Sequence, residues 1–187
     1  MTSSPPHISW RIATHADTPA IVTLVNSAYR GDASRAGWTT EADLLDGQRT
    51  EADEISELIA AADSLFILGF AQHSLCASAH LKRDPVGAYL GMVVVNPQLQ
   101  ARGIGRALIA ECERLAQQQW QANTMRMTVI TLRETLIAYY QRLGYQRTGI
   151  LHAFPRDPRF GIAKVEGLVL EELRKPLADQ AHLQQTS

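Results

Sequence analysis

Two arginines and two glycines lie close together near the middle of the chain. Arg102, Gly103, Gly105 and Arg106 follow an apolar run and an Asn-Pro pair, and they precede a segment with the periodicity of an amphipathic helix. The first turn of a helix leaves backbone N–H groups without intrahelical partners, and the helix dipole makes that end partially positive. Glycine has no Cβ, so a ligand can approach its backbone closely. The segment therefore predicts a site for a phosphate-bearing ligand.

Two other phosphate-binding motifs do not match this segment. The dinucleotide fingerprint needs a third glycine where this chain has Leu108, and seven residues separate Val95 from Gly103. A P-loop needs a lysine followed by serine or threonine, whereas Arg106 and Ala107 stand there. The remaining structural alternative is a strand–loop–helix joint that binds nothing.

Segments on both sides of the glycines carry further patterns. Residues 93–97 are Val-Val-Val-Asn-Pro, residues 100–105 are Gln-Ala-Arg-Gly-Ile-Gly, and residues 138–145 are Ala-Tyr-Tyr-Gln-Arg-Leu-Gly-Tyr. In this order they resemble the signatures of the GNAT superfamily of acyl-CoA-dependent N-acyltransferases. Those signatures are Q/R-x-x-G-x-G/A after an apolar strand, and a helix with tyrosine four residues before Gly-Phe/Tyr. The resemblance covers about residues 8–172.

The resemblance implies a fold and a cofactor. The fold would be α+β, an α/β/α sandwich with a mixed, mostly antiparallel sheet and helices on both faces. The cofactor would be acetyl-CoA. By similarity, the backbone of residues 93–95 would pair with the pantetheine arm, an amide of Val93 or Val94 would stabilise the oxyanion, and residues 101–106 would hold the pyrophosphate. The implied cofactor-binding residues are Val93, Val94, Val95, Gln100, Ala101, Arg102, Gly103, Ile104, Gly105, Arg106 and Arg133.

Two positions matter for chemistry, one on the helix predicted over residues 134–143 and one directly before it. Tyr140 occupies the family's tyrosine position, which implies a general acid that protonates the departing thiolate; an ordinary phenol has a pKa of about 10. The alternative for Tyr140 is a purely packing role, which we predict for Tyr139. Many family members have an asparagine seven residues before the tyrosine, where this chain has Arg133. Arg133 could contact cofactor phosphates, an acidic acceptor or solvent.

The proton acceptor is left open by the sequence. Positions where several family members carry a catalytic glutamate hold Tyr89 and Thr128, and neither is a base. Water could accept the proton, the amine could enter already neutral, or another side chain could act as the base. The candidate side chains are Glu41, Glu51, His80, Glu134 and His152.

The acceptor is predicted only as a class, a primary amine of a small molecule or peptide. Trp38 could form a wall of the acceptor site, and Glu41 or Asp43 could bind a cationic amine. Arg35 and Arg49 argue instead for a carboxylate or phosphate on the acceptor, so the signs conflict. The expected activity is N-acetyl transfer from acetyl-CoA by direct attack. The alternative is a non-catalytic acyl-CoA-binding or sensing module, because the glutamate is absent; the presence of Tyr140 favours the enzyme.

Composition limits the other possibilities. A chain of 187 residues with a formal net charge of −1 predicts one domain and gives no reason to expect a nucleic-acid or membrane partner. Cys76 and Cys112 lie in apolar stretches, which predicts buried thiols and no metal site. No signal peptide or ~20-residue apolar span is present, so we expect a cytoplasmic protein. A homodimer is possible, because dimers are common in the family.

Hydrophobic periodicity predicts the order of elements within a domain of residues 1–175, followed by a flexible tail over residues 176–187. Helices are expected after Asp17, over 41–45 and 52–62, after the glycine loop, and over 134–143. Strands are expected over 7–13, 64–71, 74–82, 89–95, 125–131, 145–150 and 164–170.

Overall fold

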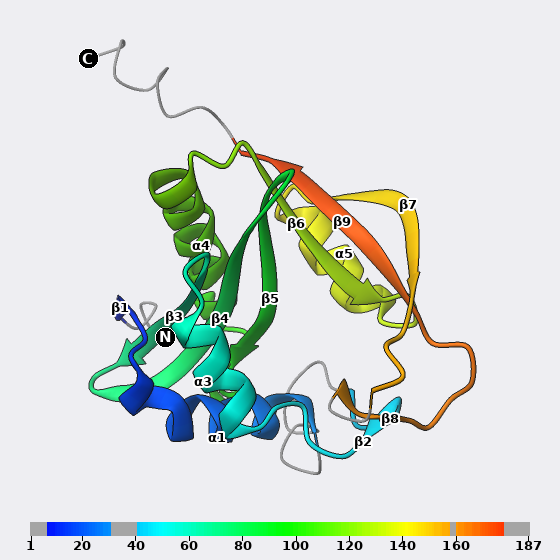
Figure 1. The fold of residues 1–187 in the computed structure, drawn as a ribbon, viewed down its shortest axis with the longest axis horizontal. Helices are drawn as coiled ribbons and strands as arrows, with labels where there is room; N and C mark the ends of the chain where they lie inside the picture. Colours follow the sequence, from blue (N-terminus) through cyan, green and yellow to red (C-terminus); the bar gives the residue numbers. More distant parts are fainter. Residues whose placement is uncertain (1–6, 31–40, 158–159, 178–187) are drawn as a thin grey trace, which may run out of the picture.

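The computed structural model describes residues 7–30, 41–157 and 160–177. Seven strands form one sheet in the order β1-β3-β4-β5-β6-β9-β7, in which β5 and β6 are the parallel pair (Figure 1). A two-stranded sheet, β2-β8, lies outside it. The elements are β1 (Ile8–Ile12), η1 (His15–Asp17), α1 (Thr18–Tyr29), β2 (Leu45–Asp46), α3 (Ala52–Ala60), β3 (Ser64–Ala71), β4 (Ser74–Asp84), β5 (Gly87–Val95), η2 (Pro97–Leu99), α4 (Ile104–Trp120), β6 (Thr124–Ile130), α5 (Glu134–Arg142), β7 (Gln146–Ala153), β8 (Ile162–Ala163) and β9 (Val169–Pro176).

Helices pack on both faces of the large sheet, which confirms the predicted sandwich. On one face α1 and α3 bury Ile21, Val25 and Ile55 against β3 and β5. On the other face, Leu108 of α4 and Ile137 of α5 are fully buried in the larger core cluster. The helices are amphipathic, so each buries an apolar stripe on the sheet and leaves its polar side to water.

Strand β5 changes the face to which its side chains point halfway along its length. Leu90 packs in the core under α4, but Met92 and Val94 pack in the core on the α1 side. Strict alternation would keep all three on one face. The change occurs at Met92, whose φ is +46°, and the pairing register of β4 with β5 shifts at the same place. This is a β-bulge, which adds a residue to one strand and re-aims those that follow.

Strands β5 and β6 pair only at their beginnings. The pairs are Ala88 with Met125 and Tyr89 with Arg126. Beyond them β6 continues to pair with β9, and the two parallel strands diverge (Figure 1). The facing edges of β5 and β6 are therefore left without a strand partner near the middle of the sheet.

A buried ion-pair network joins three segments at the wide end of this opening. Glu41 accepts hydrogen bonds from Arg30, at the end of α1, and from Arg133, at the start of α5; the Arg133 Nη1 to Glu41 Oε1 distance is 2.7 Å. The three side chains are 6–10 % exposed. Arg30 also donates to the carbonyl oxygen of Phe160 at 3.1 Å. The network fixes α1, α5 and the segment before β2 relative to one another.

Most of the predicted elements are confirmed, and two are wrong. The β3–β4 hairpin turns at Gln72 and His73 as expected. The helix expected over 41–45 is a turn, because Leu45 and Asp46 pair instead with Ala163 and Ile162. The strand expected over 164–170 is also wrong, because the last strand is β9, over residues 169–176.

The described structure reaches Leu177, within the segment that the sequence analysis assigns to the tail. Leu177 is buried and donates its N–H to the carbonyl oxygen of Asn123 at 2.8 Å, so ordered structure continues past residue 175. The rest of the expected tail, 178–187, lies outside the described residues.

Within the described part of the chain, no helix is long and apolar enough to cross a membrane. Cys76 and Cys112 are buried free thiols, as predicted. No cluster of metal-ligating side chains occurs among the same residues.

Gly87 should be required at the narrow end of the opening. Its φ is +139°, and a Cβ there would lie 2.3 Å from the carbonyl oxygen of Thr124 in β6. We expect Gly87→Ala to lower the free energy of unfolding by at least about 3 kcal/mol, because strain and a backbone clash add. Gly167→Ala is the matched control, since φ is +68° there and a Cβ would meet nothing within 4 Å; it should cost about 1–2 kcal/mol. Equal losses in urea denaturation would contradict the close approach of β5 to β6.

Glu41 should be required for stability. Replacing it by alanine leaves two buried guanidinium groups without their shared carboxylate. We expect Glu41→Ala to lower the free energy of unfolding by about 3–5 kcal/mol. The control is Asp63→Ala, which breaks an exposed 3.9 Å ion pair with Arg83 and should cost less than about 1 kcal/mol. Urea denaturation of both variants measures the difference, and a similar small loss in both would show that the network does not stabilise the fold.

Candidate active site

The glycine loop joins β5 to α4 and presents unpaired backbone donors. After the short helix η2, Ala101 and Gly103 adopt positive φ angles of 62° and 79°, and α4 begins at Ile104. Among the described residues, no acceptor pairs with the backbone N–H groups of 101–106. These donors therefore gather at the positive end of a 17-residue helix, an arrangement that suits an anion.

The side chains of this loop fit a diphosphate. Arg102 and Arg106 are exposed, and neither forms an ion pair with a carboxylate of the described residues. A Cβ on Gly105 would lie 3.1 Å from the hydroxyl oxygen of Tyr139, so a larger residue there would require the tyrosine to shift by a few tenths of an ångström. Gln100 donates to the carbonyl oxygen of Val95 at 3.2 Å and ties the loop to the end of β5.

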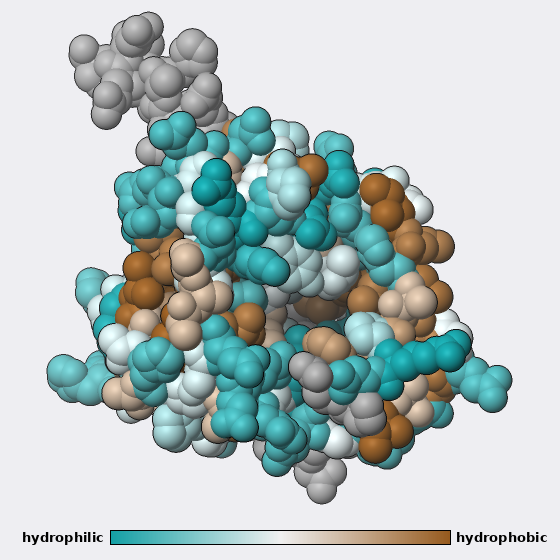
Figure 2. Space-filling model, in the orientation of Figure 1, coloured by the Kyte–Doolittle hydropathy of each residue, from teal (hydrophilic) through white to brown (hydrophobic). Residues whose placement is uncertain are grey.

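A cleft of about 690 Å³ occupies the opening between β5 and β6. Figure 2 shows the hollow near the centre of this face of the molecule. Residues 89–93 of β5 form one wall and residues 126–130 of β6 the other, while the end of α1 and one side of α5 complete the lining. The bulged strand β5 and helix α5, which carries the tyrosine signature of the sequence, therefore line the same cleft.

Tyr140 of α5 lines this cleft. Its side chain is largely buried, and its hydroxyl has no hydrogen-bond partner among the described residues. Burial raises the pKa of Tyr140 well above its usual value, and Tyr29 adds to that effect while Arg133 opposes it. The phenol is therefore protonated at neutral pH and retains a proton that it can donate. Tyr139 packs edge-on against Tyr140, with ring centroids 5.6 Å apart.

Two further tyrosines of the cleft were not assigned a role from the sequence. The hydroxyl of Tyr29 donates to the carbonyl oxygen of Val93 at 2.9 Å, in the bulged part of β5. The hydroxyl of Tyr89 lies 3.0 Å from that of Thr128 on β6, and bridges the two diverging strands. Neither tyrosine belongs to a motif, because both act through contacts with residues far away in the sequence.

Two residues assigned to ligands from the sequence contact each other. Arg133 was assigned to the cofactor and Glu41 to a cationic amine, but the structure pairs their side chains within the buried network. A solvated Arg133 is thereby excluded, while its assignment to the cofactor and that of Glu41 to the amine remain predictions. Trp38, the other residue assigned to the acceptor, lies outside the described residues.

The five candidate proton acceptors are dispersed. Glu51, Glu134 and His152 do not line the cleft, whereas Glu41 and His80 do. Both carboxylate oxygens of Glu41 already accept hydrogen bonds from arginines. Burial, with help from Lys82 and Arg49, lowers the pKa of His80 to about 4, and its Nε2 lies 2.8 Å from Ser64 Oγ. His80 is therefore neutral at pH 7 but is a weak base.

Comparison with solved structures finds the same fold at low sequence identity. The ribosomal-protein-S18-alanine N-acetyltransferase from Escherichia coli is 15% identical, with a TM-score of 0.67 over 92% of this chain and 96% of that one. The yncA protein of Salmonella typhimurium, solved with its cofactor acetyl-CoA, is 17% identical, with a TM-score of 0.66 over 93% and 96%. An N-acetyltransferase from Staphylococcus aureus Mu50 is 13% identical, with a TM-score of 0.68 over 92% and 99%.

Comparison of the sequence itself identifies the family. No curated protein matches the chain. The acetyltransferase (GNAT) family matches residues 22–145, which include both the bulged strand and the tyrosine helix. This match covers more than half of the sequence, and the glycine loop and Tyr140 lie within it. The chain belongs to the GNAT family of acetyltransferases, enzymes that use acetyl-CoA.

Proposed function

We propose that this enzyme transfers the acetyl group of acetyl-CoA directly to a primary amine of a small molecule or peptide, with Tyr140 as the general acid. The observation that carries this proposal is the Tyr140 hydroxyl. It belongs to a cleft-lining side chain, is protonated at neutral pH and donates to no described residue. An acid placed there can protonate a thiolate as it leaves.

The glycine loop and β5 would hold the cofactor. Acetyl-CoA supplies an activated thioester when it is bound. In our proposal the N–H groups of 101–106 bind its diphosphate, with Arg102 and Arg106 adding charge. The backbone of Val93, Val94 and Val95 binds the pantetheine arm along the edge that β6 leaves open. Two carbonyl groups of this edge are already fixed, by Tyr29 at Val93 and by Gln100 at Val95.

The bulge favours one backbone donor for the oxygen that gains negative charge. Val94 pairs with Ser78 of β4, and Gly91 pairs with His80, but Met92 and Val93 have no partner in that register. Of the two amides considered from the sequence, we therefore assign the role to the N–H of Val93. A donor that is fixed before the reaction stabilises developing charge without reorganisation.

The amine must reach the carbonyl carbon without its extra proton. His80 is the cleft-lining candidate base that no carboxylate or arginine holds, yet its low pKa makes it a weak acceptor. We therefore infer that the acceptor attacks as a neutral amine and that His80 receives a proton only after the new bond has begun to form. At that stage the nitrogen is far more acidic, so a weak base suffices.

Thiol release with a panel of amines tests this function. The purified chain is mixed with acetyl-CoA and each small-molecule or peptide amine, and the acetylated product is identified by mass. At least one amine should raise thiol release well above the rate without amine. Saturable binding of acetyl-CoA without any amine-dependent release would instead support the acyl-CoA-binding module and contradict the transfer reaction.

Tyr140→Phe tests the general acid. The substitution removes one oxygen, so we expect kcat to fall about 10²- to 10⁴-fold while the KM for acetyl-CoA changes little. Tyr145→Phe is the matched control, because that hydroxyl donates to Glu113 at 2.9 Å and the residue does not line the cleft. It should leave kcat unchanged and lower stability by about 1 kcal/mol. Steady-state kinetics of both variants decide the matter, and an unchanged kcat in Tyr140→Phe would exclude the assignment.

A further inference from the structure

We infer that the acceptor carries an anionic group, a carboxylate or a phosphate, and that Arg49 and Lys82 bind this group within the cleft. The inference rests on the proposed function, because it names the acceptor class for the same site. It resolves the conflict of charges in the sequence, where Glu41 pointed to a cationic acceptor and Arg49 to an anionic one.

The ionisable lining of the cleft has an excess of positive charge. Six cationic side chains face three carboxylates, with His80 neutral: Arg30, Arg49, Lys82, Arg83, Arg126 and Arg133 against Glu41, Glu54 and Asp84. This excess repels an amine that carries only positive charge, whereas an acceptor that also bears an anion is attracted.

Four of the six cations already have partners. Arg30 and Arg133 share Glu41, and Arg126 contacts Asp84. Arg83 lies at the exposed rim, 3.9 Å from Asp63. Each of these four cations has a carboxylate of the protein nearby. None of them therefore requires an anionic ligand to balance its charge.

Arg49 differs from the others because its charge is not matched by a carboxylate. No described carboxylate forms an ion pair with it, and its buried Nη1 has no hydrogen-bond partner among the described residues. The guanidinium lies over the ring of Tyr29, 5.7 Å from the centroid. A ring contact satisfies the face of a guanidinium, but its N–H groups point outward in the plane and still need acceptors. Two oxygens of a carboxylate or phosphate match that donor edge.

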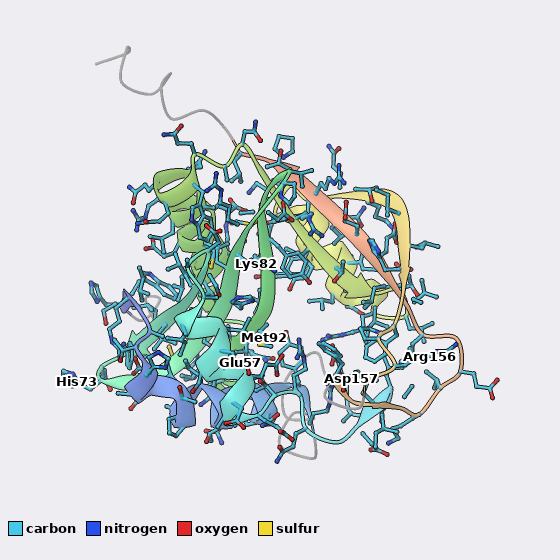
Figure 3. All side chains as sticks on the ribbon, viewed as in Figure 1. Glu57, His73, Lys82, Met92, Arg156 and Asp157 are labelled. Atoms are coloured by element: carbon cyan, nitrogen blue, oxygen red, sulfur yellow. The ribbon has the colours of Figure 1, made fainter. Side chains whose placement is uncertain are left out.

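Lys82 supplies a second positive charge in the lining of the cleft. It lies on β4 directly opposite Tyr89 in the register, and it forms no ion pair with a described residue. Figure 3 labels Lys82 and, further along the opening, Met92 of the bulge. The charges of Lys82 and Arg49 both act on the ring of His80, which also lines the cleft. In our inference these two cleft-lining cations act on the same anion.

The position of Arg49 connects this anion site to the reacting end of the cleft. Arg49 lies over the ring of Tyr29, and the hydroxyl of Tyr29 donates to the carbonyl oxygen of Val93. Val93 also carries the N–H group that we assign to the oxygen that gains negative charge. An acceptor held by its anionic group at Arg49 can thus present an amine, a few bonds away, beside the bulge. Binding of this kind orients the nucleophile and reduces the entropy lost on reaction.

Matched acceptors test the inference with the unmodified protein. Each set contains one amine scaffold as the free carboxylate, as its neutral amide, and as the corresponding phosphonate. We expect kcat/KM to be at least tenfold higher for one or both anionic forms than for the amide, and the better anion identifies which oxygen group the site prefers. Equal or higher kcat/KM for the neutral amides would overturn the inference while leaving acetyl transfer intact, whereas no turnover of any amine would overturn the proposed function itself.

Variants locate the effect at Arg49. Arg49→Gln should raise the KM for the preferred anionic acceptor about 10- to 100-fold, the range expected for a charge-assisted hydrogen bond, and leave that for the amide unchanged. Arg49→Lys should restore part of the difference, and Lys82→Gln should give a smaller loss. Arg156→Gln is the control, an exposed cation outside the cleft, and should change neither KM. If Arg49→Gln and Lys82→Gln are both folded by thermal melting and affect anionic and neutral acceptors alike, the assignment is wrong.

Discussion

The divergence of β5 and β6 is the constraint on which the rest of this structure depends. Two neighbouring strands that stay paired satisfy their own backbone, and they leave nothing for a ligand to bind. Here the pairing stops after two residue pairs, and the bulge at Met92 turns the following residues of β5 toward the other face. The sheet thereby exposes unpaired strand edges in its interior, which is the local chemistry that an extended amide chain such as pantetheine can complete.

Several side chains keep this opening from closing or collapsing. Tyr89 bridges β5 to Thr128, Tyr29 holds the carbonyl of Val93, and the buried Glu41 network secures the helices around the wide end. The buried network carries two positive charges and one negative charge, so it also contributes to the positive potential of the cleft. Structural support and ligand preference therefore divide the cations of the cleft between them: Arg30 and Arg133, paired with Glu41, support the fold, and the cations without a carboxylate partner among the described residues are the ones that we assign to a substrate.

Local patterns in the sequence predict most of the helices and strands, but they do not predict the features that form the site. The β3–β4 turn and helix α4 follow from residues close together in the chain. Strand β9 lies further along the chain than the sequence predicts. It contains Glu171 and Glu172, which are buried against Arg147, Arg126 and Arg174 of the same sheet, and these ion pairs leave no hydrophobic pattern in the sequence. The bulge could not be predicted from the sequence. The residues at its position are all apolar, so a change in the face of the sheet to which their side chains point leaves no signal in the hydrophobic pattern. The pairing of Glu41 with Arg133 joins residues 92 positions apart, which no local pattern records.

Amide hydrogen exchange with and without acetyl-CoA tests the central claim most directly. Backbone N–H groups that lack partners exchange quickly, and they slow when a ligand accepts their hydrogen bonds. The account predicts that acetyl-CoA slows exchange at residues 101–106 and at Val93, on the open edge of β5. Saturable binding of acetyl-CoA that leaves the exchange of all these amides unchanged would contradict it.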